Sequence, residues 1–91
     1  MLSDQEIKKI ILFKLFNRRY WGGKHTSFDN LKKGVKISEL GKGGIKRIHK
    51  MGEELIKDGL LVSKPTKYGL EISLNPRKHE EIMDILKKLE F

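Results

Sequence analysis

The N-terminal part of the chain contains a helical pattern that is apolar on more than one side. Four apolar residues of the segment 4–19 share one face at helical spacing: Ile7, Ile10, Ile11 and Leu15. Three others fall on different faces: Leu12, Phe13 and Phe16. A helix of this kind has to be covered on several sides. We therefore expect it at the centre of the fold, with another helix or a second subunit behind it.

Caps and glycines predict where the helices begin and end. Ser3 and Glu6 form an S-x-x-E capping box at the start of the first helix. Thr26 is a suitable N-cap for a short second helix over residues 27–33, with Phe28 and Leu31 facing inward and Gly34 as its terminator. A third helix is predicted over residues 44–58, ending before a glycine at position 59.

The last third of the chain predicts a β-hairpin followed by a helix. Leu70, Ile72 and Leu74 alternate with polar residues, as in a half-buried strand. Residues 60–63 are the expected partner strand, and residues 64–69 the loop, so the hairpin spans about 60–74. Asn75 and Pro76 then favour a helix over about 76–90.

These elements predict a single domain over residues 1–91, mainly α with a small β-hairpin (α+β), in the order helix-helix-helix-hairpin-helix.

The chain has no cysteine, so disulfides and thiolate metal sites are excluded. No apolar run approaches the roughly 18 residues of a membrane span, and the early acidic residues are unlike a signal peptide. We expect a soluble cytoplasmic protein with no membrane partner.

The positive charge is concentrated in one part of the chain. The net charge is +8, and residues 31–68 hold ten basic and four acidic residues, whereas residues 69–91 hold four and five. A localised basic surface is typical of proteins that bind a polyanion, most often nucleic acid. The alternative is a surface rich in ion-pair networks, as in thermophiles, which predicts a balanced charge throughout.

The element order and the charge placement together resemble the winged helix-turn-helix superfamily over almost the whole chain. The blocks YWGGKHT…NLKKG and KPTKYGLEISLNP are also similar to small, poorly characterised winged-helix proteins of archaea. This resemblance implies nucleic-acid binding, with the third helix in the major groove and the hairpin loop, the wing, on the backbone or in the minor groove.

The resemblance gives the basic residues of the third helix a role. Basic residues gather at the N-terminal end of this helix, where the macrodipole is positive and disfavours cations: Lys42, Lys46, Arg47 and Lys50. This arrangement suggests that an external anion compensates the charge. We expect Lys46, Arg47 and Lys50 to enter the groove, with Arg47 suited to a bidentate guanine contact. The alternative is a solvated lysine face.

The hairpin loop is the second expected contact. Lys64 and Lys67 are predicted phosphate contacts, with Tyr68 beside them. The alternative is an ordinary turn, with Tyr68 packing back on the domain.

A third group of cations surrounds the only tryptophan, in RRYWGGKHT at residues 18–26. We expect Tyr20 and Trp21 to pack over the edge of the core, or alternatively to stack on an unpaired base. The four basic side chains of this stretch should project near the surface of the third helix: Arg18, Arg19, Lys24 and His25.

The sequence indicates no catalytic site, metal or cofactor. The stretches GGK at 22–24 and GKGG at 41–44 do not match a phosphate-binding loop. The three histidines, His25, His49 and His79, are scattered without metal-ligand spacing. We expect a non-enzymatic protein that binds double-stranded DNA, such as a transcriptional regulator, and a homodimer through the first and last helices is an option. The alternatives are an RNA- or ribosome-associated protein, or a winged-helix adaptor for acidic proteins.

Overall fold

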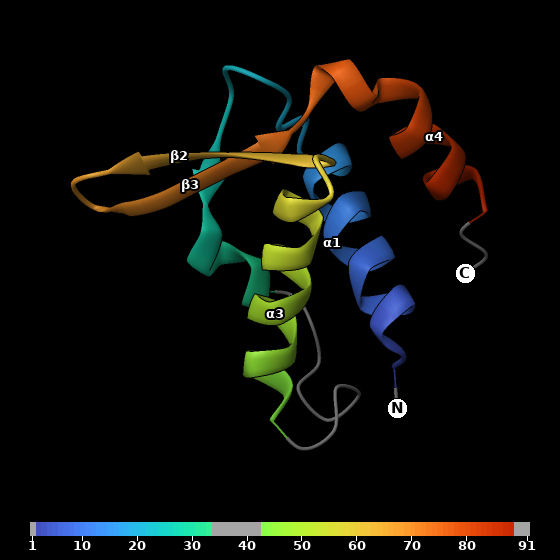
Figure 1. The fold of residues 1–91 in the computed structure, drawn as a ribbon, viewed down its shortest axis with the longest axis horizontal. Coiled ribbons are helices and arrows are strands. Elements are labelled where there is room, and N and C mark those ends of the chain that lie inside the picture. Colours follow the sequence, from blue (N-terminus) through green and yellow to red (C-terminus); the bar gives the residue numbers. More distant parts are fainter. Residues whose placement is uncertain (1, 34–42, 89–91) are drawn as a thin grey trace.

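Helices and strands combine in an α+β arrangement, which is the class that the sequence predicts (Figure 1). The computed structural model describes residues 2–33 and 43–88. The elements in chain order are α1 (Asp4–Asn17), β1 (Thr26–Ser27), η1 (Phe28–Lys32), α3 (Gly44–Lys57), β2 (Leu61–Thr66), β3 (Gly69–Leu74), η2 (Pro76–Lys78) and α4 (His79–Lys87). The predicted terminator Gly34 lies outside the described residues.

The helix α1 starts as predicted and lies against α3, α4 and β3. The Ser3 backbone N–H donates to Glu6 Oε1 at 3.0 Å and the Glu6 N–H donates to Ser3 Oγ at 3.1 Å, which confirms the capping box. The helix ends two residues early, at Asn17, because Arg19 adopts a left-handed φ of 59°.

The apolar faces of α1 are covered by α3, α4 and β3, as its pattern demands. Its most buried side chains belong to the core, which gathers residues from every part of the fold: Ile7, Ile11, Leu12, Leu15, Phe28, Leu31, Ile48, Met51, Leu55, Leu60, Leu61, Ile72, Leu74 and Ile82. Because α4 packs on α1 within one chain, part of the face considered for a second subunit is already occupied.

Among the described residues, the sheet has three antiparallel strands in the order β1-β3-β2, and the strand β1 was not predicted. Thr26 pairs with Ile72 and Ser27 with Glu71, so Thr26 is a strand residue and not a helix cap. Ser27 takes the cap position, where its hydroxyl accepts from the Asp29 N–H at 3.3 Å. The predicted second helix is therefore the 3-10 helix η1, whose Phe28 is buried toward the core as expected.

The β2–β3 hairpin is longer and its turn tighter than the sequence indicates. Lys64 and Pro65 belong to β2, opposite Glu71 and Leu70, and only Lys67 and Tyr68 form the turn. The Thr66 hydroxyl stabilises this turn, because it accepts from the Tyr68 N–H and donates to the carbonyl oxygen of Gly69. Figure 1 shows the hairpin projecting well beyond the helices.

The remaining boundaries agree with the caps in the sequence. Helix α3 spans Gly44–Lys57, and Gly59 follows with a φ of 83°. Asn75 caps the next element through its Oδ1, which accepts from the Arg77 N–H at 3.0 Å. This element is first the 3-10 turn η2, and the α-helix starts only at His79. The final residues of the predicted helix, 89–90, lie outside the described part of the chain.

Candidate nucleic-acid interface

The exposed face of α3 carries lysines along its length. Lys46, Lys50 and Lys57 are exposed, with Glu53 among them. They lie opposite the buried stripe of the helix, which contains Ile48, Met51 and Leu55. Ile45 is 43% exposed and lies next to Lys46. The first two turns of α3 therefore present positive charge to the solvent, as predicted for Lys46 and Lys50.

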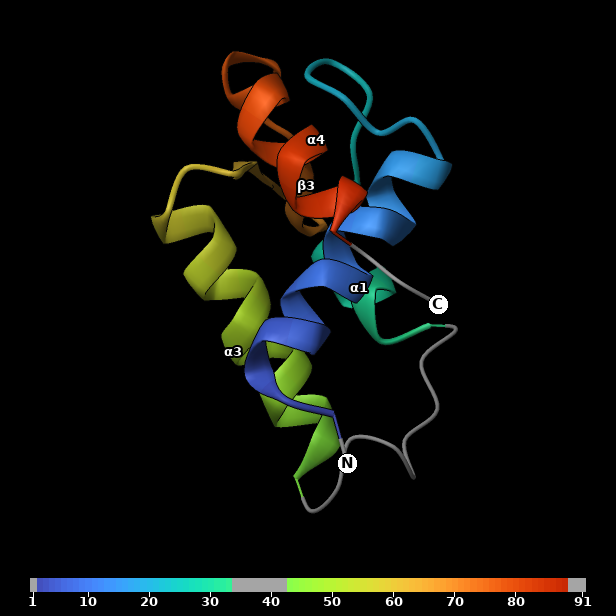
Figure 2. The same ribbon diagram turned by 90° about the vertical axis from the view of Figure 1, so that its right-hand side faces the viewer.

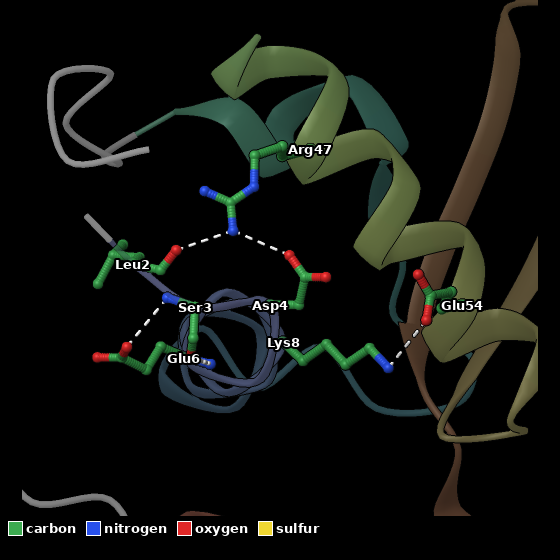
Figure 3. Close-up of polar contacts among 7 residues, drawn as sticks. All are labelled: Leu2, Ser3, Asp4, Glu6, Lys8, Arg47 and Glu54. Carbon is green, nitrogen blue, oxygen red and sulfur yellow. Dashed lines mark hydrogen bonds and ion pairs between the residues drawn. The ribbon is translucent and has the colours of Figure 1, made fainter. Parts of the chain in front are cut away.

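The structure separates Arg47 from these lysines. Its Nη2 donates to the carbonyl oxygen of Leu2 at 2.8 Å and to Asp4 Oδ1 at 2.9 Å, at the start of α1 (Figure 3). One residue along a helix is a rotation of about 100°, which is enough to turn Arg47 toward α1 while Lys46 points to solvent. A bidentate guanine contact would have to replace these bonds, so the groove role expected for Arg47 has no support in this geometry.

A second polar contact joins the same two helices. Lys8 Nζ lies 3.2 Å from Glu54 Oε1, and Figure 3 shows this pair further along α3 than the Arg47 contact. Glu54 is thereby turned toward α1 and its charge is paired. The acid that remains on the outer face of α3 is Glu53, together with Asp58 at the end of the helix.

The contact between Arg47 and Asp4 also affects titration. The hydrogen bond from Arg47 holds the pKa of Asp4 below its ordinary value of 3.8, with smaller contributions from the nearby charges of Arg47, Lys50 and Lys8. Arg47 therefore joins α3 to the start of α1, and its hydrogen bond favours the ionised form of the Asp4 carboxyl group.

The hairpin tip forms a second exposed group of basic and aromatic side chains. Tyr68 is 89% exposed, so the alternative that it packs back on the domain is wrong. Lys67 Nζ lies 5.2 Å from the centre of the Tyr68 ring. Lys64 is also exposed, although it sits in β2 and faces Glu71 across the ladder. The tip thus offers two lysines and a free aromatic ring to a partner.

The segment 18–25 lies away from this surface. In Figure 2 it is on the opposite side of the molecule from α3, at the C-terminal end of α1, so the expectation that it projects near α3 is wrong. Arg18, Arg19 and Lys24 are exposed there. The imidazole Nδ1 of His25 lies 3.8 Å from Glu71 Oε1, which gives His25 a partner within the chain.

Backbone contacts with β3 explain why this segment lies where it does. The Leu74 N–H donates to Tyr20 O at 2.8 Å, and the Gly22 N–H donates back to Leu74 O at 3.1 Å. The buried hydroxyl of Ser73 donates to Gly22 O at 2.9 Å. Tyr20 and Trp21 are partly buried against the core, and the Trp21 ring lies 5.1 Å from that of His79. The structure supports packing, not base stacking, for both aromatic residues.

The remaining expectations concern Lys42, His49, metal sites and membrane spans. Lys42 lies outside the described residues. His49 is half-buried with its ring 5.2 Å from that of Phe28, and its Nε2 has no hydrogen-bond partner among the residues that the structure describes. Within residues 2–33 and 43–88, no cluster of His, Asp and Glu side chains has the arrangement of a metal site. No helix in the same ranges is long and apolar enough to cross a membrane.

Comparison of the chain with models of protein families, with curated proteins and with solved structures returns no significant match.

Proposed function

We propose that the protein is a non-enzymatic winged-helix protein that binds double-stranded DNA. In this proposal α3 enters the major groove and the β2–β3 hairpin is the wing on the backbone. The observation that carries it is the outer face of α3, where Lys46 and Lys50 are exposed in the first two turns while Glu54 is turned toward α1.

The hairpin tip supports the same proposal. Lys64 and Lys67 are exposed on an arm that projects from the C-terminal end of α3 (Figure 1). Lysines in such a position contact phosphates, which fixes the orientation of a protein on a duplex without reading its sequence. The order of α3, β2 and β3 is that of a recognition helix followed by a wing, and β1 on the far edge of β3 is compatible with it.

The test compares two double variants of equal charge change. Lys46→Ala/Lys50→Ala removes the lysines of α3, and Lys87→Ala/Lys88→Ala removes two exposed lysines of α4. Binding to a duplex is measured by fluorescence anisotropy over a salt series. Each lost phosphate contact reduces the magnitude of the slope of log K against log salt by about 0.9. For the first variant this magnitude should therefore fall by roughly two. The α4 variant should bind like the wild type.

Equal binding by the two variants, with unchanged melting temperatures, would contradict the proposal. Lys64→Ala/Lys67→Ala should lower the slope by a similar amount if the hairpin contacts phosphates. An acidic peptide that competes as well as the duplex would instead favour a protein adaptor.

One observation favours RNA or another nucleic acid with unpaired bases as a second candidate. The Tyr68 ring is almost fully exposed at the tip of the hairpin. Exposed aromatic rings stack on unpaired bases, with about 1–3 kcal/mol per base. If this candidate is correct, Tyr68→Ala weakens binding to a looped RNA much more than binding to a duplex. An equal effect on both would favour the DNA proposal.

A further inference from the structure

A half-open cavity of about 590 Å³ lies between α1 and η1, on a different side of α1 from α3. Three of its α1 residues, Ile10, Phe13 and Asn17, are about half a turn away from Lys8, which faces α3. The lining residues come from α1, the segment after it, β1 and η1 with its cap: Ile10, Phe13, Lys14, Leu15, Asn17, Arg18, Tyr20, Thr26, Asn30, Leu31 and Lys33. The cavity is therefore distinct from the α3 face and the hairpin.

The charged residues of this lining are all basic. Lys14, Arg18 and Lys33 contribute to it, and no Asp or Glu does among the residues that the structure describes. Lys14 Nζ is fixed in the wall, because it donates to Asn30 O at 2.6 Å and also to the carbonyl oxygen of Lys33. These acceptors are neutral carbonyls, so they orient the ammonium group without neutralising it.

The surroundings of Lys14 disfavour its charged form. Burial lowers the pKa of Lys14, and the positive charges of Arg18 and Lys33 lower it further. Arg18 and Lys33 are exposed at the mouth, and neither forms an ion pair in the described part of the chain. A bound anion would relieve this repulsion, since it supplies the missing opposite charge.

The uncharged part of the lining combines three polar residues, Asn17, Thr26 and Asn30, with apolar and aromatic ones. Ile10, Phe13, Leu15 and Leu31 form the walls, together with the half-buried ring of Tyr20. The volume falls within the range of about 300–1,000 Å³ that is typical of small-molecule sites. The lining thus combines apolar and aromatic walls with three basic residues.

We propose that this cavity binds a small aromatic carboxylate, whose ring lies between the apolar walls and whose carboxylate lies among Lys14, Arg18 and Lys33. This site is independent of the proposed nucleic-acid surface. It gives the protein a place for an effector on the side of α1 that does not carry the α3 lysines.

The experiment uses a matched pair of probes that differ only in charge. 1-Naphthoate and its neutral amide, 1-naphthamide, are titrated into the full chain at one salt concentration, with the affinity from calorimetry and the location from amide NMR shifts. We expect naphthoate to bind at least about tenfold more tightly than the amide, which corresponds to one charge-assisted contact. The shifted signals should belong to residues of the cavity lining.

Two double variants complete the test. Arg18→Gln/Lys33→Gln should remove the preference for the carboxylate, whereas Arg77→Gln/Lys78→Gln changes the same residue types on η2 and should keep it. Equal affinity for the two probes would overturn the proposal, as would shifts centred on α3 or the hairpin. A further outcome is an increase of the molecular mass with protein concentration in the absence of naphthoate, together with shifts of the cavity signals. That result would show that a second copy of the chain occupies the cavity, and it would overturn the proposal.

Discussion

Replacing Gly52 by alanine is expected to destabilise the protein, although alanine is the better helix former. Gly52 lies in the middle of α3, where η1 packs directly against the helix. A Cβ atom at this position would lie 2.9 Å from Leu31 Cδ1, 2.9 Å from Phe28 Cε2 and 3.0 Å from Phe28 Cζ. Carbon atoms in ordinary contact are separated by about 3.5–4.0 Å, so both side chains have to move.

The size of the effect follows from two opposing contributions. Leu31 is 1% exposed and Phe28 is 9% exposed, so neither side chain has solvent to move into. Overpacking of a filled core costs about 1–3 kcal/mol. The higher helix propensity of alanine returns about 0.8–1 kcal/mol. The expected net loss is about 1 kcal/mol, which lowers the melting temperature of a domain of this size by about 4–8 °C.

Thermal and urea unfolding followed by circular dichroism measure this loss. Gly23→Ala is the control, because among the described residues beyond its chain neighbours no atom lies within 4 Å of a Cβ built there. Its stability should stay within about 0.5 kcal/mol of the wild type. Gly52→Val should lose more than Gly52→Ala, since it adds two further methyl groups at the same contact. A Gly52→Ala variant as stable as the wild type would refute the close packing of η1 on α3.

Three further predictions concern the ends of α1. Ser3→Ala removes the capping box and should cost about 1 kcal/mol in urea unfolding, whereas a loss below the error would show that the cap is not formed in solution. Because the fold lowers the pKa of Asp4, its contribution to stability is present above the ordinary value of 3.8 and is lost as pH falls through the lower folded pKa. In the Arg47→Ala variant, the free energy of unfolding should therefore fall less steeply with decreasing pH in the acid range than in the wild type. The same dependence on pH in both proteins would contradict the contact between Arg47 and Asp4. The fluorescence of Trp21 should be unaffected by added nucleic acid, and strong quenching would indicate base stacking instead.

Local signals in the sequence were enough to predict α1, α3 and the hairpin. Their caps, glycines and apolar periods act within a few residues, and Ser3 with Glu6 is an example that the structure reproduces at both hydrogen bonds. The strand β1 was not predictable in this way. It has only two residues, and what makes Thr26 a strand residue is its partner Ile72, far along the chain.

The same distinction applies to the candidate interface. The helical period alone predicted that Lys46 and Lys50 face the solvent. The position of Arg47 depends on Asp4 and on Leu2, which belong to another helix and its approach. The proposed ligand site in the cavity depends on Lys14, which interrupts an apolar run in α1. This interruption was the only signal of the cavity in the sequence.

The position of Pro65 has a consequence for how copies of the protein meet. Strand β2 is at the edge of the sheet, and the two-residue turn makes Thr66 and Gly69 a hydrogen-bonded pair. Pro65 is the next residue along, so its ring nitrogen faces outward, where any other residue would offer a donor to an incoming strand. A projecting hairpin whose edge strand exposed all of its backbone hydrogen-bonding groups would pair with the hairpins of other molecules and aggregate. The proline interrupts that edge, so the arm can stay long and accessible while the molecules remain separate.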